Sequence, residues 1–385
     1  MVKQLFCGGT GSRLLAMSRS LDNDRFDHTV VAINRPECEV DKRQLQYYVD
    51  AGVEVVDWGE DDSKIQSLSY VPRKTLAVLR AVRRACHMIR ERGIDIVDAH
   101  LDLAGLIGFV AARITGSKVT ITLYHPPPEI IWGFLGKFCT GMADAVITDS
   151  RIRAQEIREW KFGFRDNVLV IPSGIFPPFA TSTQEGMRKL LNLPANPEIK
   201  VVGTIGRFHP PKGQHVLLQA ARAVLDKEPK TVFLVVGYCF HKPDAFYKEQ
   251  LERQASDLGI LEHVRILTYP GPIGDIWQVI DIHAHPTLFD SLPISIMEGM
   301  SLSKPAVVTS VGGIPELVGH DQTGLVVPPG NAEMLAGALL RLLQDPQTAR
   351  SLGAKAQQRY QALYTPERRT RELENVFHTL VNGQG

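Results

Sequence analysis

The sequence predicts an α/β protein with two doubly wound parallel sheets. Segments rich in Val and Ile alternate with segments of helical periodicity along nearly the whole chain, as in parallel strands joined by crossover helices. The 385 residues suffice for two domains with sizeable cores. The composition, 44% hydrophobic and 22% charged, is typical of a globular protein in water.

Charge and cysteine usage exclude several classes. A formal net charge of +1 gives no support for a nucleic-acid partner. The five cysteines are scattered without a disulfide framework, which favours a reducing cytoplasm. The first residues form too short an apolar run for a signal peptide, and the apolar run from Leu103 to Ala112 could not span a bilayer. We therefore expect a cytoplasmic protein, with at most peripheral attachment at the inner face of a membrane.

A glycine-rich turn follows the first expected strand, Val2 to Phe6. The turn reads Cys7-Gly-Gly-Thr-Gly-Ser-Arg and leads into a helix from about Ser12 to Leu21. Small residues let backbone N–H groups approach a ligand closely. The turn is similar both to half of a dinucleotide-binding fingerprint and to the signature loop of sugar nucleotidyltransferases. A third interpretation depends on the C-terminal half of the chain.

The rest of the first half continues the alternation. Strands are expected at 28–34, 53–59, 94–100, 118–125, 143–150 and from 168. A helix from about Thr75 to Gly93 carries five arginines and one acid. The ordinary account is a solvated face, and the alternative is attraction to anionic lipid, with Arg13 and Arg19 adding to the basic surface. His100 and His125 each end an expected strand, and ligands bind at strand ends in open parallel sheets.

Two cations follow the first strand of the second half. The strand ends at Gly206, and Arg207 and Lys212 stand in the loop before the next helix. The ordinary interpretation is a pair of surface cations. The functional interpretation is that a planar guanidinium and a compact ammonium neutralise a diphosphate together.

Two acids, Asp290 and Glu298, are separated by seven residues further along. Proline is favoured in a first helical turn, so a helix is expected to start near Pro293. Asp290 then lies in the preceding loop and Glu298 inside the helix, while the N–H groups from Ile294 onward form an anion site. In the ordinary alternative, the acid before the helix only stabilises the helix dipole, and the Glu within the helix is solvated.

These segments resemble the nucleotide-sugar end of retaining glycosyltransferases of family 4, which have the GT-B fold. The family pattern combines G-R-x4-K-G, E-x7-E, a P-V-V strand, G-G-x-x-E and G-x-L-V-x-P; here Asp290 replaces the first Glu. The match is tight from Lys200 to Pro328 and looser before Gly174. At residues 173–176, S-G-I-F replaces the family's N-G-[VI]-D turn. The resemblance favours interpreting the first glycine turn as a loop that faces diphosphate and acceptor.

The resemblance implies two Rossmann-like domains facing a deep cleft. An acceptor-side domain would span residues 1–178, with helix 366–385 packing back on it, and a donor domain would span 179–365. The implied catalytic residues are His100, Arg207, Lys212 and Asp290. The implied donor-binding residues are Gly9, Gly206, Arg207, Lys212, Tyr269, Ile273, Asp290, Leu292, Pro293, Ile294 and Glu298. Those on the acceptor side are Gly9, Thr10 and His125.

The implied activity is retaining transfer of a hexose from a UDP-sugar such as UDP-glucose. The acceptor would be a glycan or a lipid-linked saccharide in polysaccharide or glycoconjugate biosynthesis. No cofactor and no metal are expected, because no D-x-D or His cluster with metal-ligand spacing stands out. Two alternatives stay open: a nucleotide-sugar epimerase or hydrolase on the same fold, and a non-catalytic nucleotide-sugar-binding module.

Overall fold

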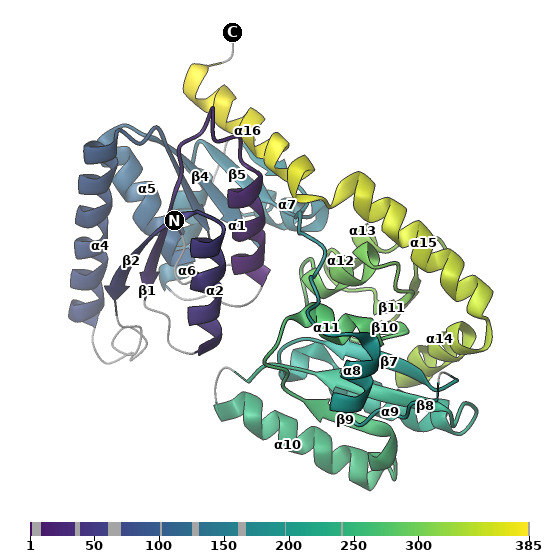
Figure 1. Ribbon diagram of the computed structural model, residues 1–385. Helices are drawn as coiled ribbons and strands as arrows, with labels where there is room; N and C mark the ends of the chain where they lie inside the picture. Colours follow the sequence, from purple (N-terminus) through teal and green to yellow (C-terminus); the bar gives the residue numbers. More distant parts are fainter. Residues whose placement is uncertain are drawn as a thin grey trace. The chain divides into compact units, whose positions relative to one another are not determined.

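The chain forms two compact units (Figure 1). The computed structural model describes residues 1–385 apart from 2–8, 35–38, 61–70, 101, 125–130, 161–166, 197, 240–241 and 384–385. Unit 1 comprises Met1–Gly174 and Pro366–Gly385, and unit 2 comprises Ile175–Thr365. The structure thus divides the chain after Gly174, whereas the expected boundary lies after residue 178. The strand expected at 2–6 lies outside the described residues.

Unit 1 is built from parallel strands and surrounding helices. The strands are β1 Thr29–Asn34, β2 Glu54–Glu60, β3 Ile96–His100, β4 Lys118–Leu123, β5 Ala145–Thr148 and β6 Val168–Val170. The helices are α1 Gly9–Ser20, α2 Glu39–Asp50, α4 Val71–Arg92, α5 Asp102–Thr115, α6 Ile131–Gly141, α7 Arg151–Arg158 and α16 Pro366–Asn382. Strand β1 pairs with β2, and β3 to β6 form a sheet in chain order, all pairs being parallel.

Close helix packing fixes the core of unit 1. Helix α5 approaches the sheet at Gly108, where a Cβ would lie 3.0 Å from that of Ala99. The apolar run that looked too short for a bilayer is this buried helix, and Ala104 and Ala112 are fully buried within it. The C-terminal helix α16 packs on α1, and Phe377 shares an apolar cluster with residues of that helix (Figure 1). The last segment of the chain therefore belongs to unit 1.

Unit 2 is a larger sheet with helices on both faces. Its strands are β7 Lys200–Ile205, β8 Thr231–Val236, β9 Val264–Leu267, β10 Ile282–His285, β11 Ala306–Thr309 and β12 Leu325–Val327. Its helices are α8 Gln184–Leu190, η1 Pro210–Lys212, α9 Gln214–Leu225, α10 Lys242–Asp257, η2 Leu261–His263, α11 Ile273–Val279, α12 Ile294–Ser301, α13 Ile314–Leu317, α14 Ala332–Gln344 and α15 Pro346–Leu363.

In unit 2, the order in which successive strands join the sheet reverses at β7, although all the strands are parallel. All pairs are parallel, in the order β12-β11-β10-β7-β8-β9. Successive strands run outward from β7 through β8 to β9, and then from β10 through β11 to β12 on its other side. Alternate strand residues pack on α9, α10 and α14 on one face, and on α8, α11 and α12 on the other. In such sheets ligands bind beyond the carboxyl ends of the two strands at the reversal, here β7 and β10.

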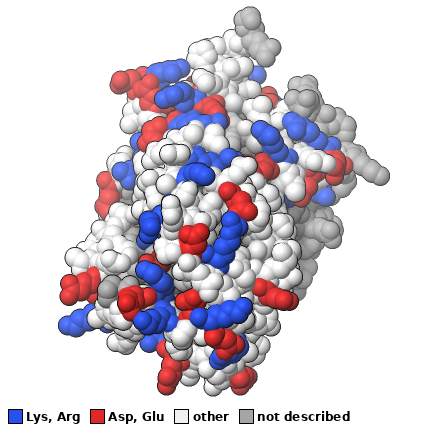
Figure 2. Space-filling model, turned by 90° about the vertical axis from the view of Figure 1, so that its right-hand side faces the viewer, with Lys and Arg blue, Asp and Glu red and all other residues white. Residues whose placement is uncertain are grey.

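The doubly wound α/β architecture with two Rossmann-like domains is confirmed. None of the helices within the described ranges is both long and apolar enough to cross a membrane. Acidic and basic side chains are interspersed on the face that Figure 2 draws, in keeping with a formal net charge of +1.

Candidate functional site

Two loops meet at the strand reversal of unit 2, one between β7 and α9 and the other between β10 and α12. The backbone N–H of Leu288 donates to the carbonyl of Pro211 at 2.7 Å, and the Thr287 hydroxyl donates to the same carbonyl at 2.9 Å. Gly213 has φ 69°, and a Cβ there would lie 1.9 Å from the carbonyl oxygen of Pro286. Glycine is therefore required for this close approach.

A Gly-Gly turn after β11 supports the second loop from its other side. Gly312 has φ 50°, and a Cβ there would lie 2.0 Å from the carbonyl oxygen of Asp290. The N–H of Gly313 donates to the carbonyl of Ser291 at 2.8 Å. The backbone that carries Asp290 is thus fixed by contacts from two other loops.

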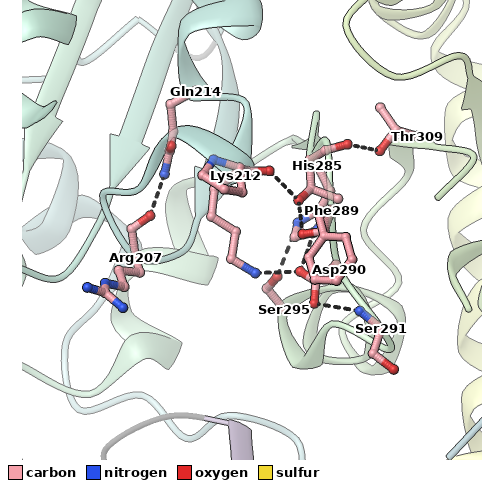
Figure 3. Close-up of polar contacts among 11 residues, drawn as sticks. Arg207, Lys212, Gln214, His285, Phe289, Asp290, Ser291, Ser295 and Thr309 are labelled. Atoms are coloured by element: carbon pink, nitrogen blue, oxygen red, sulfur yellow. Dashed lines mark hydrogen bonds and ion pairs between the residues drawn. The ribbon is translucent and has the colours of Figure 1, made fainter. Parts of the chain in front are cut away.

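Lys212 and Asp290 form an ion pair across these loops (Figure 3). The Lys212 ammonium donates to Oδ2 of Asp290 at 2.5 Å, and Nε2 of His285 lies 3.5 Å from the same oxygen. The other carboxylate oxygen accepts from the N–H of Ser291 at 3.0 Å. The hydroxyl of Ser295, in the first turn of α12, lies 3.4 Å from Nδ1 of His285.

These contacts determine the charge state of the acid. Burial alone would raise the pKa of Asp290, but His285 and Lys212 together hold it well below its usual range. Burial lowers the pKa of His285, and the neighbouring carboxylate only partly opposes that effect. Near neutral pH the cluster therefore contains an ionised Asp290 and a predominantly neutral imidazole.

Arg207, directly after β7, is paired with an acid from a different element. Its Nε and Nη2 donate to the two carboxylate oxygens of Asp244 at 2.9 and 2.8 Å, and Asp244 belongs to the first turn of α10. The side-chain amide of Gln214 donates to the Arg207 carbonyl at 2.8 Å (Figure 3). The arginine is therefore anchored through both its backbone and its guanidinium.

Glu298 lies on α12, which begins at Ile294 after an N-cap at Pro293 that makes no side-chain cap bond. Its carboxyl accepts a hydrogen bond from Nε1 of Trp277 at 3.1 Å. Burial raises the pKa of Glu298 to about 7, although the bond from Trp277 opposes the shift. This carboxyl therefore changes its charge near neutral pH.

The structure brings most of the expected donor residues to one edge of the unit 2 sheet. They are Gly206, Arg207, Lys212, Asp290, Pro293, Ile294 and Glu298. Two others point inward: the Tyr269 hydroxyl donates to Asp275 at 2.7 Å, and the Leu292 side chain is buried in the core. Only the backbone of these two residues can therefore serve a ligand without rearrangement. Ile273 opens α11, and the roles of all these residues stay predictions.

The remaining expected residues belong to unit 1. Gly9 and Thr10 open α1, and His125 lies outside the described residues. His100 ends β3 and is buried, with Nε2 at 2.9 Å from Asp98 and Nδ1 at 3.4 Å from the Tyr124 hydroxyl. Both ring nitrogens thus have a partner within unit 1, and the catalytic role of His100 also stays a prediction.

Unit 1 has a buried charge cluster that sequence patterns did not indicate. Arg13 lies 3.3 Å from Asp149, which follows β5, and its guanidinium stacks 4.4 Å from the centre of the Tyr124 ring. Burial raises the pKa of Asp149, although Arg13 and Arg369 oppose the shift. The expectation that Arg13 adds to a basic outer surface is wrong, because this side chain is buried against Asp149.

Asp244, Gln214 and His285 of unit 2 were likewise not predicted. An acid in a first helical turn looks like an ordinary dipole partner, so Asp244 carries no distinctive local signal. The H-x-H pair ending β10 was the one visible hint of a polar strand end. Within the described ranges, no three His, Cys, Asp or Glu side chains are grouped so that they could hold a metal ion.

Both halves of the chain match models of known protein families. Residues 8–174 match the model of the glycosyl transferase 4-like domain, and residues 190–359 match that of the glycosyl transferases group 1. A D-inositol 3-phosphate glycosyltransferase of Corynebacterium urealyticum is 28% identical over 62% of this chain and 57% of that protein. An Escherichia coli UDP-Gal:alpha-D-GlcNAc-diphosphoundecaprenol alpha-1,3-galactosyltransferase is 23% identical over 67% of this chain and 68% of that protein.

Solved structures match over nearly the full length. Anabaena HepE in complex with UDP-glucose superposes with a TM-score of 0.81 at 21% identity, covering 98% of each chain. Sucrose-phosphate synthase from Thermosynechococcus elongatus has a TM-score of 0.77 at 20% identity, covering 98% of this chain and 94% of that chain. Since the two family models cover both units and these structures share the fold, the chain belongs to the family 4 glycosyltransferases and has the GT-B fold.

Proposed function

We propose that this chain transfers a hexose from a nucleotide-sugar to a saccharide acceptor, with retention of the anomeric configuration. The observation that carries the proposal is the convergence of Arg207, Lys212 and the start of α12 beside Asp290 and Glu298. The donor we propose is a UDP-sugar such as UDP-glucose. The complex of HepE with UDP-glucose and the name of the E. coli relative support that choice.

The two cations suit the departing diphosphate. Cleavage of a glycosidic bond passes through an oxocarbenium-like sugar, so stabilising the separating charges is the main task. The side chains of Arg207 and Lys212 are 36% and 29% exposed, while their partner acids are buried. A diphosphate can therefore reach either cation. With both cations in place, we propose that the reaction needs no metal ion.

The two acids take different parts of the donor in this proposal. Asp290 accepts hydrogen bonds from sugar hydroxyls, and Glu298 accepts from the ribose diol. Asp290 also pairs with Lys212. The carboxylate that binds the sugar therefore touches the ammonium that binds the phosphates. A shorter acid than the family's Glu is compatible with this double contact, since Asp290 lies directly beside the ammonium.

The deciding experiment combines binding with turnover. Calorimetry with UDP, GDP, ADP and UDP-glucose should show the tightest binding for the uridine ligands. Incubation of UDP-glucose with lipid-linked and soluble saccharides should then release UDP only when an acceptor is present, with equal rates in EDTA. Free epimerised sugar from UDP-glucose alone would support the epimerase alternative. Binding without transfer to any acceptor would support the non-catalytic module, and tighter GDP or ADP binding would overturn the choice of base.

We further propose a lipid-linked acceptor reached at the inner face of a membrane. The α4 arginines Arg80, Arg83 and Arg90 are exposed, and Leu76 and Leu79 are exposed on the same helix. Cations next to exposed leucines suit an anionic lipid surface. The diphosphoundecaprenol in the name of the E. coli relative supports such an acceptor for this chain.

Cosedimentation with vesicles tests this attachment. Each arginine near an anionic surface contributes about 1 kcal/mol, so Arg80→Gln and Arg83→Gln should each weaken binding to anionic vesicles about fivefold at low salt. Arg253→Gln, at an exposed site on α10 of unit 2, serves as the matched control. Protein that stays in the supernatant with anionic vesicles at low salt would point to a small soluble acceptor.

A further inference from the structure

We propose that Asp244 is a positioning residue that fixes the Arg207 guanidinium for the diphosphate of the donor. The inference rests on the proposed function and assigns a role to an acid outside the family motifs. Asp244 stands at the start of α10, whereas Arg207 follows β7 and lies 37 residues earlier in the chain. The two side chains meet in a fork of two hydrogen bonds, at 2.9 and 2.8 Å.

The burial of Asp244 makes this pairing persistent. Its side chain is only 1% exposed, and an ionised carboxylate is costly to bury without a charged partner. Arg207 supplies that partner with two parallel N–H groups, which is the strongest geometry available to a carboxylate. Its own side chain is 36% exposed, so the same guanidinium lies partly inside the protein and partly at its surface.

The fork fixes the plane of the guanidinium as well as its position. Asp244 takes the edge formed by Nε and Nη2, and Nη1 is not part of the fork. Gln214, which is buried at the first position of α9, holds the Arg207 carbonyl at 2.8 Å. With both ends of the residue anchored, Arg207 loses little conformational freedom when it binds an anion.

Lys212 is held differently, which separates the two cations by role. Its ammonium donates to Asp290 and stands at the end of a flexible four-carbon stem, about which it can rotate. Arg207 is instead restricted to one orientation by Asp244. We infer that Arg207 provides a fixed set of donors for the diphosphate, while Lys212 adjusts to the ligand.

Calorimetry with UDP tests the role of Asp244. Asp244→Asn keeps the side-chain volume but removes one acceptor of the fork, and should weaken UDP binding about three- to tenfold. In UDP-glucose turnover, the same variant should lower kcat as well as raise KM, because a mobile Arg207 also serves the departing diphosphate less well. Glu252 lies on the same helix and forms an ion pair with Lys248, so Glu252→Gln is the matched control and should change neither value.

A double-mutant cycle shows whether Asp244 acts through Arg207. In an Arg207→Ala background, Asp244→Ala should cause no further loss of UDP affinity, because the group that it positions is gone. Equal losses in both backgrounds, or tighter UDP binding by Asp244→Asn alone, would overturn the inference. Unfolding midpoints identify any variant that fails to fold, and Asp244→Asn then replaces Asp244→Ala in the cycle.

The results also separate this inference from the proposed function. If wild-type protein binds no nucleoside diphosphate, both proposals fail. If it binds UDP and Arg207→Ala weakens the binding while Asp244→Asn does not, the proposed function stands and the positioning role alone is overturned.

Discussion

Both units place charged side chains at the carboxyl ends of parallel strands, but they treat those charges differently. In unit 2 the cations Arg207 and Lys212 are about a third exposed, and each is held by a buried acid. In unit 1 the side chains of Arg13 and Asp149 are 6% and 0% exposed, so that pair is enclosed. Ends of parallel strands therefore carry charges that can meet a ligand in unit 2 and charges that hold the unit together in unit 1.

The difference has a physical basis in the cost of burial. A cation that is partly in water can share its charge between an internal acid and an incoming phosphate without full desolvation. When both side chains of an ion pair are buried, neither can lose the other, because separation would leave an uncompensated charge in the interior. Substitutions should accordingly affect activity in unit 2 and stability in unit 1.

The largest effect is expected for the cations of unit 2. Lys212→Ala and Arg207→Ala should each lower turnover by roughly 10²–10³, the range for loss of one preorganised charge-stabilising group. Steady-state kinetics with UDP-glucose provide the measurement. Lys230→Ala removes an exposed cation of the same unit and should leave turnover unchanged. If turnover falls less than about threefold in both variants, the two cations lie outside the reacting site. The proposed difference between the units would then be wrong.

The enclosed pair of unit 1 should respond in stability. Asp149→Asn removes the carboxylate that pairs with the Arg13 guanidinium and should lower the free energy of unfolding by about 3–5 kcal/mol. Urea unfolding gives that value, and UDP affinity should stay the same. Asp24→Asn, at an exposed acid of the same unit, is the control. A variant of wild-type stability that binds UDP more weakly would assign this pair to ligand binding instead.

A smaller effect is expected from the titration of Glu298. Its pKa of about 7 in the folded protein exceeds the ordinary value of 4.5, so the carboxyl is largely protonated at about pH 6 and largely ionised at about pH 8. If the ionised form accepts from the ribose, UDP affinity should rise up to about tenfold over that range. Glu298→Gln should show no such rise. Parallel pH profiles of the two proteins would show that Glu298 does not bind the nucleotide through its charge.

The same group links pH to stability. Because the folded pKa lies above the unfolded one, its stabilising contribution is fully present below about pH 4.5 and is lost as the pH rises through about 7. The wild-type protein should therefore lose stability relative to Glu298→Gln over that window. Urea unfolding at several pH values measures the difference between the two proteins.

Local sequence patterns were sufficient for the parts of the fold and site that depend on nearby residues. Alternating strand and helix segments predicted the parallel pairing of strands in both units, and Pro293 placed the start of α12 within one residue. The expected helix start correctly put Asp290 before that helix and Glu298 inside it. Glycines in the motifs correspond to turns with close backbone contacts, at Gly213 and Gly312. Each of these features is determined by a few consecutive residues.

Partner choice between distant segments could not be predicted in the same way. Nothing in the residues around Asp244 indicates that α10 begins beside Arg207, because that contact depends on the order of the strands. Arg13 likewise looked like a surface cation until the fold enclosed it with Asp149. The charge state of Glu298 is a third case, since it depends on burial next to Trp277. Pairing and desolvation are properties of the assembled sheet.

The entry and exit of unit 2 lie side by side. The N–H of Ile175 donates to the carbonyl of Tyr364 at 3.1 Å, and the Tyr360 hydroxyl donates to the carbonyl of Ile175 at 2.6 Å. A single uninterrupted stretch of the chain thus forms a module whose two ends are hydrogen-bonded to each other. We expect residues 175–365 to be exchangeable between relatives as one cassette, and to tolerate circular permutation with a short peptide joining the old ends.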